Sequence, residues 1–349
     1  MGWAVFCLSP IKRLQADIKE VDEAVKTYKE DIITKHPNYL VSRIFKASDD
    51  PIVPERPADA DSTFEYRWFR AHYFDNLDFA DECLLRTPIF AQRLDYFITK
   101  LVPQIPDSII PAAIGLAEQA KANREIFKYT VHTLTNKYES SKIMCMDKVF
   151  VTMADRYYCT GLAWWTDSTQ TAKICERADK LRPLRCGERT PNVILQDTTE
   201  QNWVSLWHTD AAYTVLFFWD PSCGHCKKSM PKMKEFYDEY KPKGVEIFGV
   251  CTEFETGPWK KFLVEKEIKW SEVSGNPEVN KNAYKYLKAG ATTLQSLNFR
   301  DTYDIYSTPV IYVLDHEKKI LAKRLGAEQL AEFITNYDKA NDKLLKNAD

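Results

Sequence analysis

A pair of cysteines at the junction of an apolar run and a helical segment constrains the fold of this chain more than any other feature. The motif Cys223-Gly224-His225-Cys226 follows the run 214–219, which is rich in the β-branched and aromatic residues of buried strands. A turn at 220–222 separates the run from the motif, and helical spacing then continues to Tyr240. The pattern predicts a strand, a tight turn and a helix that begins at the first cysteine.

A cysteine at the start of a helix is placed for thiol chemistry. The first turn presents unpaired backbone N–H groups and about half a positive charge, which stabilise a thiolate. We therefore expect Cys223 to have a lowered pKa and to act as nucleophile, and Cys226 to resolve the mixed disulfide. Gly224 and His225 tune the pair, because an imidazole near the sulfur stabilises the reduced form. We therefore expect a reduction potential in the less reducing part of the range from about −270 mV (thioredoxin) to about −180 mV (protein disulfide isomerase).

After Gly187 short apolar runs alternate with helical segments, which predicts an α/β sheet with helices on both faces. The expected strands are 193–195, 214–219, 245–250, 309–314 and 319–325, and the expected helices are 223–240, 258–267, 277–288 and 327–345. The change of pattern at 186–190 predicts a domain boundary. We expect residues 188–349 to fold alone and to keep disulfide-reducing activity.

The chain before that boundary has helical periodicity, and a length of 349 residues favours at least two domains. The expected divisions are an amphipathic helical segment (1–48), a Pro- and Asp-rich linker (49–63), an all-α domain (64–186) and the α/β domain (187–349). Residues 11–32 carry a heptad seam, which we expect to pack on its own domain, with self-association as the alternative. Asp107 and Asp167 are expected helix N-caps.

Charge and hydropathy exclude some classes of function. The net charge of −2 gives no reason to expect binding to nucleic acid or to an anionic membrane. We expect no transmembrane segment, because no run approaches the roughly 18 apolar residues that a span needs. Residues 1–10 lack a basic n-region and a cleavage site, so we expect no export signal.

Seven of the nine cysteines lie outside the motif and follow no regular spacing. We expect most of them to be small buried hydrophobic residues. A Cys175–Cys186 disulfide is compatible with the sequence but not required by it. The seven are Cys7, Cys83, Cys145, Cys159, Cys175, Cys186 and Cys251.

Three alternatives compete with thiol–disulfide exchange. A zinc site needs two ligands besides Cys-x-x-Cys, and only His208 and His316 offer themselves, so we expect no metal and no cofactor beyond the redox-active disulfide. A peroxiredoxin-type peroxidase usually has its cysteine in P-x-x-x-T-x-x-C, and Asp220 stands at the threonine position. A partner-binding module that keeps the fold with inactive cysteines is the third.

The run 218–226, followed by Pro231, resembles the active site of the TlpA/ResA-like thioredoxin family, and Thr308-Pro309 resembles that fold's Thr-cis-Pro. The likeness covers about 188–345. It implies that Trp219 precedes the redox pair and that Pro309 lies beside it. An X-Pro bond adopts cis at low cost, and this geometry would turn the Thr308 backbone toward an extended substrate strand.

The resemblance also implies partners and a setting. Protein thiols or disulfides would be the substrates, with an upstream redox partner. The helical part together with this domain resembles multidomain thioredoxin-like proteins of the Bacteroidota cell envelope. That likeness implies a periplasmic or envelope location.

A buried acid is a further implication of the resemblance. Phe217 stands where thioredoxin has a buried aspartate, whereas the TlpA/ResA-like group has a glutamate after the next strand. Glu253 fits best, with Glu255 as competitor and an exposed loop position as the alternative. We expect Glu253 to be buried near Cys226, to have a raised pKa and to relay its proton.

Overall fold

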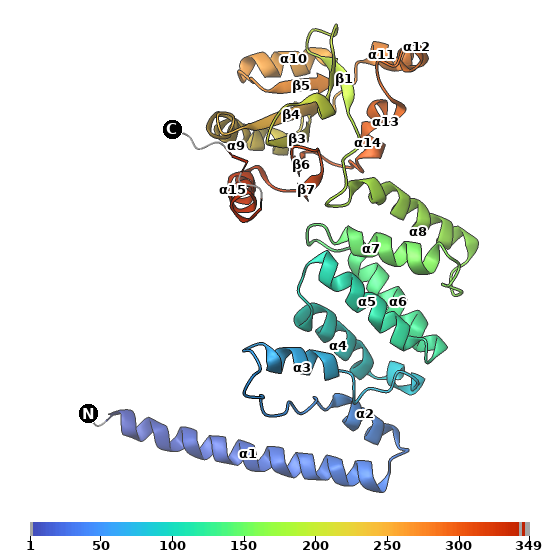
Figure 1. The fold of residues 1–349 in the computed structure, drawn as a ribbon, viewed down its shortest axis with the longest axis vertical. Coiled ribbons are helices and arrows are strands. Elements are labelled where there is room, and N and C mark those ends of the chain that lie inside the picture. Colours follow the sequence, from blue (N-terminus) through green and yellow to red (C-terminus); the bar gives the residue numbers. More distant parts are fainter. Residues whose placement is uncertain (1–2, 342–343, 346–349) are drawn as a thin grey trace. The chain divides into compact units, whose positions relative to one another are not determined.

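The structure, a computed structural model, describes residues 3–341 and 344–345. The chain divides into two compact units, one ending at Leu134 and one beginning at Thr135. The first is helical, and the second contains the sheet (Figure 1). The predicted order, a helical region followed by a thioredoxin-like α/β domain, is confirmed. None of the helices in the described part is both long and apolar enough to cross a membrane.

The first unit is built from helices around an apolar core that includes Phe90, Leu94 and Ile109. The linker 49–63 is free of helix and strand, as its prolines require. The predicted N-cap at Asp107 is wrong, because Ile105 is the N-cap and Asp107 lies in the first turn. The helices are α1 Trp3–Lys35, α2 Leu40–Ser48, α3 Phe64–His72, η1 Glu82–Arg86, α4 Pro88–Tyr96, η2 Phe97–Leu101, α5 Pro106–Ala120 and α6 Arg124–Glu139, which runs into the second unit.

The heptad seam lies on α1, as predicted, but most of it is not packed. Leu14, Ile18, Val21 and Tyr28 are each about 60% exposed. Its last turns contact α2, where the Ser42 hydroxyl donates to the Ile32 carbonyl over 3.3 Å. The expectation that the seam packs on its own domain is therefore wrong from Leu14 to Tyr28. Self-association through residues 11–32 stays a prediction.

The second unit begins with helices that precede the sheet. These are the end of α6, α7 Asp147–Met153, η3 Ala154–Tyr158, α8 Ser168–Leu181 and η4 Arg182–Leu184. Asp167 caps α8 by accepting from the Gln170 N–H, as predicted. The boundary expected at 186–190 thus differs from the division by packing, which puts these helices with the sheet.

Two disulfides fasten this helical segment. Cys145 pairs with Cys186, and Cys159 pairs with Cys175. The expectation of small buried hydrophobic residues is wrong for these four, and Cys175 and Cys186 have partners other than each other. It holds for Cys251, which is fully buried. The side chain of Cys7 lies outside the described residues.

The sheet has seven strands in the order β2-β1-β5-β4-β3-β6-β7. Parallel pairing joins β3 to β4 and β4 to β5, and the other neighbours are antiparallel. The strands are β1 Ile194–Asp197, β2 Trp203–Ser205, β3 Tyr213–Trp219, β4 Val245–Cys251, β5 Ser271–Ser274, β6 Val310–Leu314 and β7 Ile320–Lys323.

Helices cover both faces of the sheet, as predicted (Figure 1). The alternate residues Val215, Phe217 and Trp219 of β3 face a core shared with three helices, α9 Gly224–Tyr240, α10 Thr256–Glu265 and α15 Leu330–Ala340. Leu216 and Phe218 face the other core. That core includes Leu184 and residues of α13 Leu294–Leu297 and α14 Phe299–Thr302. The predicted helix 277–288 is two short helices, α11 Pro277–Lys281 and α12 Ala283–Lys288.

Candidate active site

The Cys-Gly-His-Cys motif lies at one edge of the sheet. Strands β3 and β4 are parallel, so both end at this edge, and the antiparallel β6 begins there. The turn after β3 is held by Asp220, whose carboxylate accepts from the backbone and the hydroxyl of Ser222, both at 2.6 Å. Cys223 is the N-cap of α9, so the helix begins where the sequence predicted.

Cys223 is partly exposed, and its thiol lies 3.3 Å from the Thr308 carbonyl oxygen. Burial raises the pKa of this thiol, but hydrogen bonds from the Cys226 and His225 N–H groups and from the Thr308 side chain outweigh that effect. The net pKa is lowered, because donors at a helix start stabilise the thiolate. The His225 side chain itself is exposed, as are Gly224, Lys227 and Lys228.

Cys226 differs from Cys223 in exposure and in acidity. It is 1% exposed and packs in the core that contains Trp219. Burial raises the pKa of Cys226 to about 12, although the Asp220 N–H lies 3.5 Å from its sulfur. The first cysteine is thus the more acidic and the more accessible of the pair, which is the division of labour expected of a nucleophile and a resolver.

The loop before β6 completes the site. The Thr308–Pro309 peptide bond is cis, as predicted. Residues 303–309 bring the Thr308 carbonyl to the Cys223 sulfur, so positions far apart in sequence meet at this edge of the sheet. Cys223, Cys226, Thr308 and Pro309 therefore form one site.

Glu253 does not have the predicted surroundings. Its side chain is half-buried in the loop after β4, and one carboxylate oxygen accepts from the Phe254 N–H over 2.9 Å. The expectation that it is buried is wrong, because its carboxylate stabilises its own turn. Glu255 is exposed at the start of α10.

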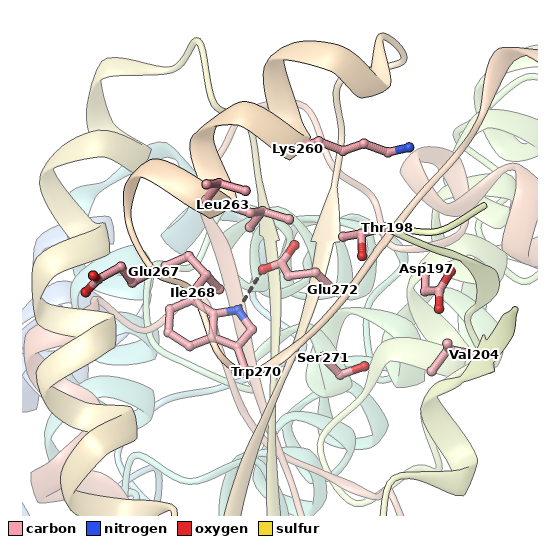
Figure 2. Close-up of a pocket in the computed structure, with 11 residues that line it drawn as sticks. Asp197, Thr198, Val204, Lys260, Leu263, Glu267, Ile268, Trp270, Ser271 and Glu272 are labelled. Carbon is pink, nitrogen blue, oxygen red and sulfur yellow. Dashed lines mark hydrogen bonds between the residues drawn. The ribbon is translucent and has the colours of Figure 1, made fainter. Parts of the chain in front are cut away.

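A different glutamate is buried beneath the site. Glu272 on β5 is 5% exposed and accepts hydrogen bonds from three indole N–H groups. The donors are Trp219 at 3.0 Å, Trp259 at 3.2 Å and Trp270 at 2.6 Å. Figure 2 shows the Trp270 indole pointing at the Glu272 carboxylate. Glu272 thus contacts Trp219, the residue that ends β3 just before the redox motif.

The environment of Glu272 changes its acidity. Burial raises its pKa to about 7, and the three indole hydrogen bonds oppose that shift. The carboxylate also fills the space beside Gly249, where an added Cβ would lie 2.0 Å from Oε1. Because Gly249 has no side chain, the Glu272 carboxylate fits beside it; any larger residue at position 249 would clash with this carboxylate.

Sequence reasoning missed Glu272 because β5 has only four residues and shows no clear alternation. The available signal was the nearness in sequence of two tryptophans, Trp259 and Trp270, to this acid. Within residues 3–341 and 344–345, no group of three or more His, Cys, Asp or Glu side chains is arranged to hold a metal ion.

Two family descriptions cover most of the chain. Residues 19–183 match "Domain of unknown function (DUF5106)", and residues 186–323 match "AhpC/TSA family". The first match covers the helical part, including the helices that pack with the sheet. The second covers the redox motif and ends at β7.

Individual relatives match less than half of the chain. Thiol-disulfide oxidoreductase ResA of Bacillus cereus is 27% identical over 160 residues, which are 46% of this chain and 80% of that protein. A domain of a "possible thiol-disulfide isomerase" of Cytophaga hutchinsonii is 36% identical, covering 45% of this chain and 96% of the domain, with a TM-score of 0.38.

One solved structure aligns with most of the chain. A thioredoxin-like protein from Bacteroides caccae covers 83% of this chain and 98% of its own, with a TM-score of 0.57 and 17% identity. At this identity the likeness supports the fold alone.

Proposed function

Because residues 186–323 form an AhpC/TSA-family domain of the ResA/TlpA-like thiol–disulfide oxidoreductases, we propose that this chain exchanges disulfides with protein substrates through Cys223 and Cys226. The observation that carries the proposal is the unequal pair at the start of α9. One thiol is accessible with a lowered pKa, and the other is buried with a raised pKa.

In the reducing direction, the Cys223 thiolate attacks one sulfur of a substrate disulfide. A mixed disulfide forms, and the other substrate sulfur leaves as a thiolate. Cys226 then loses its proton and attacks the Cys223 sulfur, which releases the second substrate thiolate. Two electrons pass to the substrate, its two sulfurs take up two protons, and the enzyme is left with a Cys223–Cys226 disulfide. The oxidising direction reverses these steps.

The loop before β6 provides a place for the substrate backbone. The Thr308 carbonyl faces the Cys223 sulfur at the edge of the sheet. An extended segment on either side of a substrate cysteine can pair with exposed backbone of this kind, which brings its sulfur to the nucleophile. Thr308 and Pro309 thus position the substrate, and the chemistry stays with the two cysteines.

The buried acid of this site is Glu272 in our proposal. It fixes the Trp219 indole, and the next backbone N–H, that of Asp220, points at the Cys226 sulfur. Glu272 therefore acts as a positioning residue for the resolving cysteine, in place of the role expected for Glu253. Trp219 transmits this effect from the core to the redox motif.

The two disulfides of the helical segment support an oxidising location. Disulfides persist in secreted and envelope compartments and are rare in the cytosol. We therefore propose that the chain works in the periplasm or cell envelope, where an upstream redox partner would restore the working state of the Cys223–Cys226 pair.

Insulin reduction driven by dithiothreitol tests the function. Wild type is expected to reduce insulin, Cys223→Ser to lose this catalysis, and Cys226→Ser to accumulate mixed disulfides. Peroxide consumption by Cys223, with no turnover of insulin, would instead favour a peroxidase. Alkylation of Cys226 before Cys223 in the reduced protein would reverse the assigned roles.

A further inference from the structure

A buried aspartate lies at the start of the loop that carries the cis-proline. Asp304 follows α14, and its side chain is 2% exposed. Its backbone has φ of 54°, in the left-handed region that only a few non-glycine residues adopt. A carboxylate this deeply buried needs partners of opposite charge.

The main partner comes from a helix that precedes the sheet domain. Arg177 of α8 donates from both terminal nitrogens to the two oxygens of Asp304, at 2.5 and 2.9 Å. The paired, planar geometry fixes direction as well as distance. Arg324, after β7, adds a longer contact of 3.3 Å from a side chain that is 63% exposed. Burial raises the pKa of Asp304, but the hydrogen bond and charge of Arg177 outweigh it and lower the pKa.

Only three residues separate Asp304 from Thr308. Ile305 is anchored, because its N–H donates to the Arg300 carbonyl over 2.8 Å and its side chain is buried. Tyr306 is 80% exposed, and Thr308 then meets the Cys223 sulfur. A shift of Asp304 would therefore pass along a short chain to the substrate-facing backbone.

The helix that holds Asp304 is itself immobilised. The Cys159–Cys175 disulfide ties α8 to the segment after η3. Lys323 of β7 donates to Asp147 over 2.5 Å and to the Leu184 carbonyl over 2.7 Å, which joins both ends of the α7–η4 segment to the sheet. Arg177 thus presents its guanidinium from a fixed support.

We propose that Arg177 is a positioning residue for disulfide exchange: by holding Asp304, it sets the loop that presents Thr308 and cis-Pro309 to a protein substrate at Cys223. The proposal rests on the exchange function proposed above and assigns part of the site to the helices before residue 186. Those helices then contribute to recognition of extended protein segments rather than to the reactivity of the thiol.

The test compares a protein disulfide with a small one. Insulin uses the loop, whereas 5,5′-dithiobis(2-nitrobenzoate) reacts with an accessible thiolate directly. We expect Arg177→Ala to lower kcat/KM for insulin by about ten- to a hundredfold, since small misplacements cost this much. Its reaction with the small disulfide should stay within about twofold of wild type, because α9 activates Cys223. Arg177→Lys should recover part of the loss.

Lys180→Ala is the matched control. Lys180 lies on the same helix and pairs with Asp301 over 2.6 Å, but both side chains are well exposed. Such surface pairs contribute little, so both reactions should remain as in wild type. If Arg177→Ala does not fold, Asp304→Asn replaces it, because asparagine tolerates the left-handed conformation and leaves no buried charge unpaired.

Unchanged insulin turnover in a folded Arg177→Ala or Asp304→Asn variant would overturn the proposal. So would an equal loss with both disulfides, which would mean a general disturbance of Cys223. A wild-type protein that reacts with the small disulfide but never turns over insulin would instead overturn the proposed function, and this inference with it.

Discussion

The helices on either side of residue 134 look alike in sequence but differ in how they are held. Those before it surround a core of their own, with Phe90 and Ile109 fully buried. Those after it are bound to the sheet by the Cys145–Cys186 disulfide, the Lys323–Asp147 ion pair and the Arg177–Asp304 ion pair. One continuous stretch of helical sequence therefore forms a separate helical unit in its first part and a portion of the sheet-containing unit in its second part.

A change of secondary structure is therefore not always a boundary between independently stable parts of the chain. The family matches meet at 183 and 186, where helices give way to strands. The packing instead separates the chain at 134 and 135. If packing contacts, and not the change of secondary structure, determine which residues fold together, the smallest stable unit that contains the redox motif is 135–349.

The largest effect should come from cutting the chain at these two places. Residues 135–349 are expected to fold and to reduce insulin like the full chain. Residues 188–349 lose Leu184, both disulfides and the partner of buried Asp304. A buried charge without its partner costs about 3–5 kcal/mol, and a lost leucine about 2 kcal/mol, against a total stability on the order of 10 kcal/mol. We therefore expect 188–349 to be much less stable than 135–349.

Urea unfolding followed by circular dichroism, together with insulin reduction, checks this prediction. A soluble 188–349 fragment with the stability and activity of 135–349 would restore the boundary expected from the sequence at 186–190. The helices of 135–184 would then be an appendage of the sheet and not a part of its fold.

The second effect concerns the covalent link alone. The Cys145–Cys186 disulfide spans 41 residues, and closing such a loop is worth about 4 kcal/mol in the chain-entropy account. The double variant Cys145→Ser/Cys186→Ser should lose stability by about that amount in the sheet-containing unit. Cys83→Ser, which alters an unpaired cysteine of the first unit, is the control and should change little. Identical urea midpoints for the double variant and wild type would show that non-covalent contacts suffice.

The third effect is a pH dependence of the stability of the sheet-containing unit. The pKa of Glu272 rises from 4.5 to about 7 on folding, so the folded state binds this proton more tightly. The resulting stability is fully present below about pH 4.5 and is lost as pH rises through about 7, by about 3 kcal/mol in all. Glu272→Gln should flatten the change in stability between pH 5 and pH 8.

Glu253→Gln is the matched control for that measurement, because its half-buried carboxylate serves only its own turn. It should keep the wild-type slope in urea titrations at both pH values. A flattened slope in Glu253→Gln, with a wild-type slope in Glu272→Gln, would return the role of buried acid to Glu253.

The smallest effect on stability is expected in the first unit, at α1. Val21 is 60% exposed, and substituting an exposed residue usually changes stability by less than about 0.5 kcal/mol. Val21→Asp should nevertheless abolish self-association through the seam, whereas Glu20→Ala, off the seam, should not. Analytical ultracentrifugation measures both. A wild-type chain that stays monomeric at high concentration would refute self-association through α1.

The redox motif could be predicted because its signals are local. Strand β3, the turn at Asp220 and the start of α9 follow from consecutive residues. The cis peptide bond at Thr308–Pro309 was predictable because the proline itself is visible in the sequence. The parts that were missed depend on partners that only folding brings together. The Glu272 carboxylate meets indoles 2, 13 and 53 residues away, and Arg177 meets a carboxylate 127 residues away.

Short elements and cysteine pairing were missed for related reasons. Strands β2 (Trp-Val-Ser) and β5 (Ser-Glu-Val-Ser) are short and lack the apolar runs from which the other strands were predicted. Four cysteines allow three pairings, and spacing along the chain does not choose among them. Cys145 lies just before α7 and Cys186 just after η4, and the packing of these two helices against the sheet brings the two cysteines together.

The three indoles around Glu272 give the molecule an intrinsic optical signal. Emission from tryptophan depends on the charge next to its ring nitrogen, and a disulfide quenches an excited indole more strongly than a thiol does. Trp219 donates to Glu272 and shares a core with Cys226, so we expect its fluorescence to change with the proton on the acid and with oxidation of the Cys223–Cys226 pair. Exchange can therefore be followed in real time without a label.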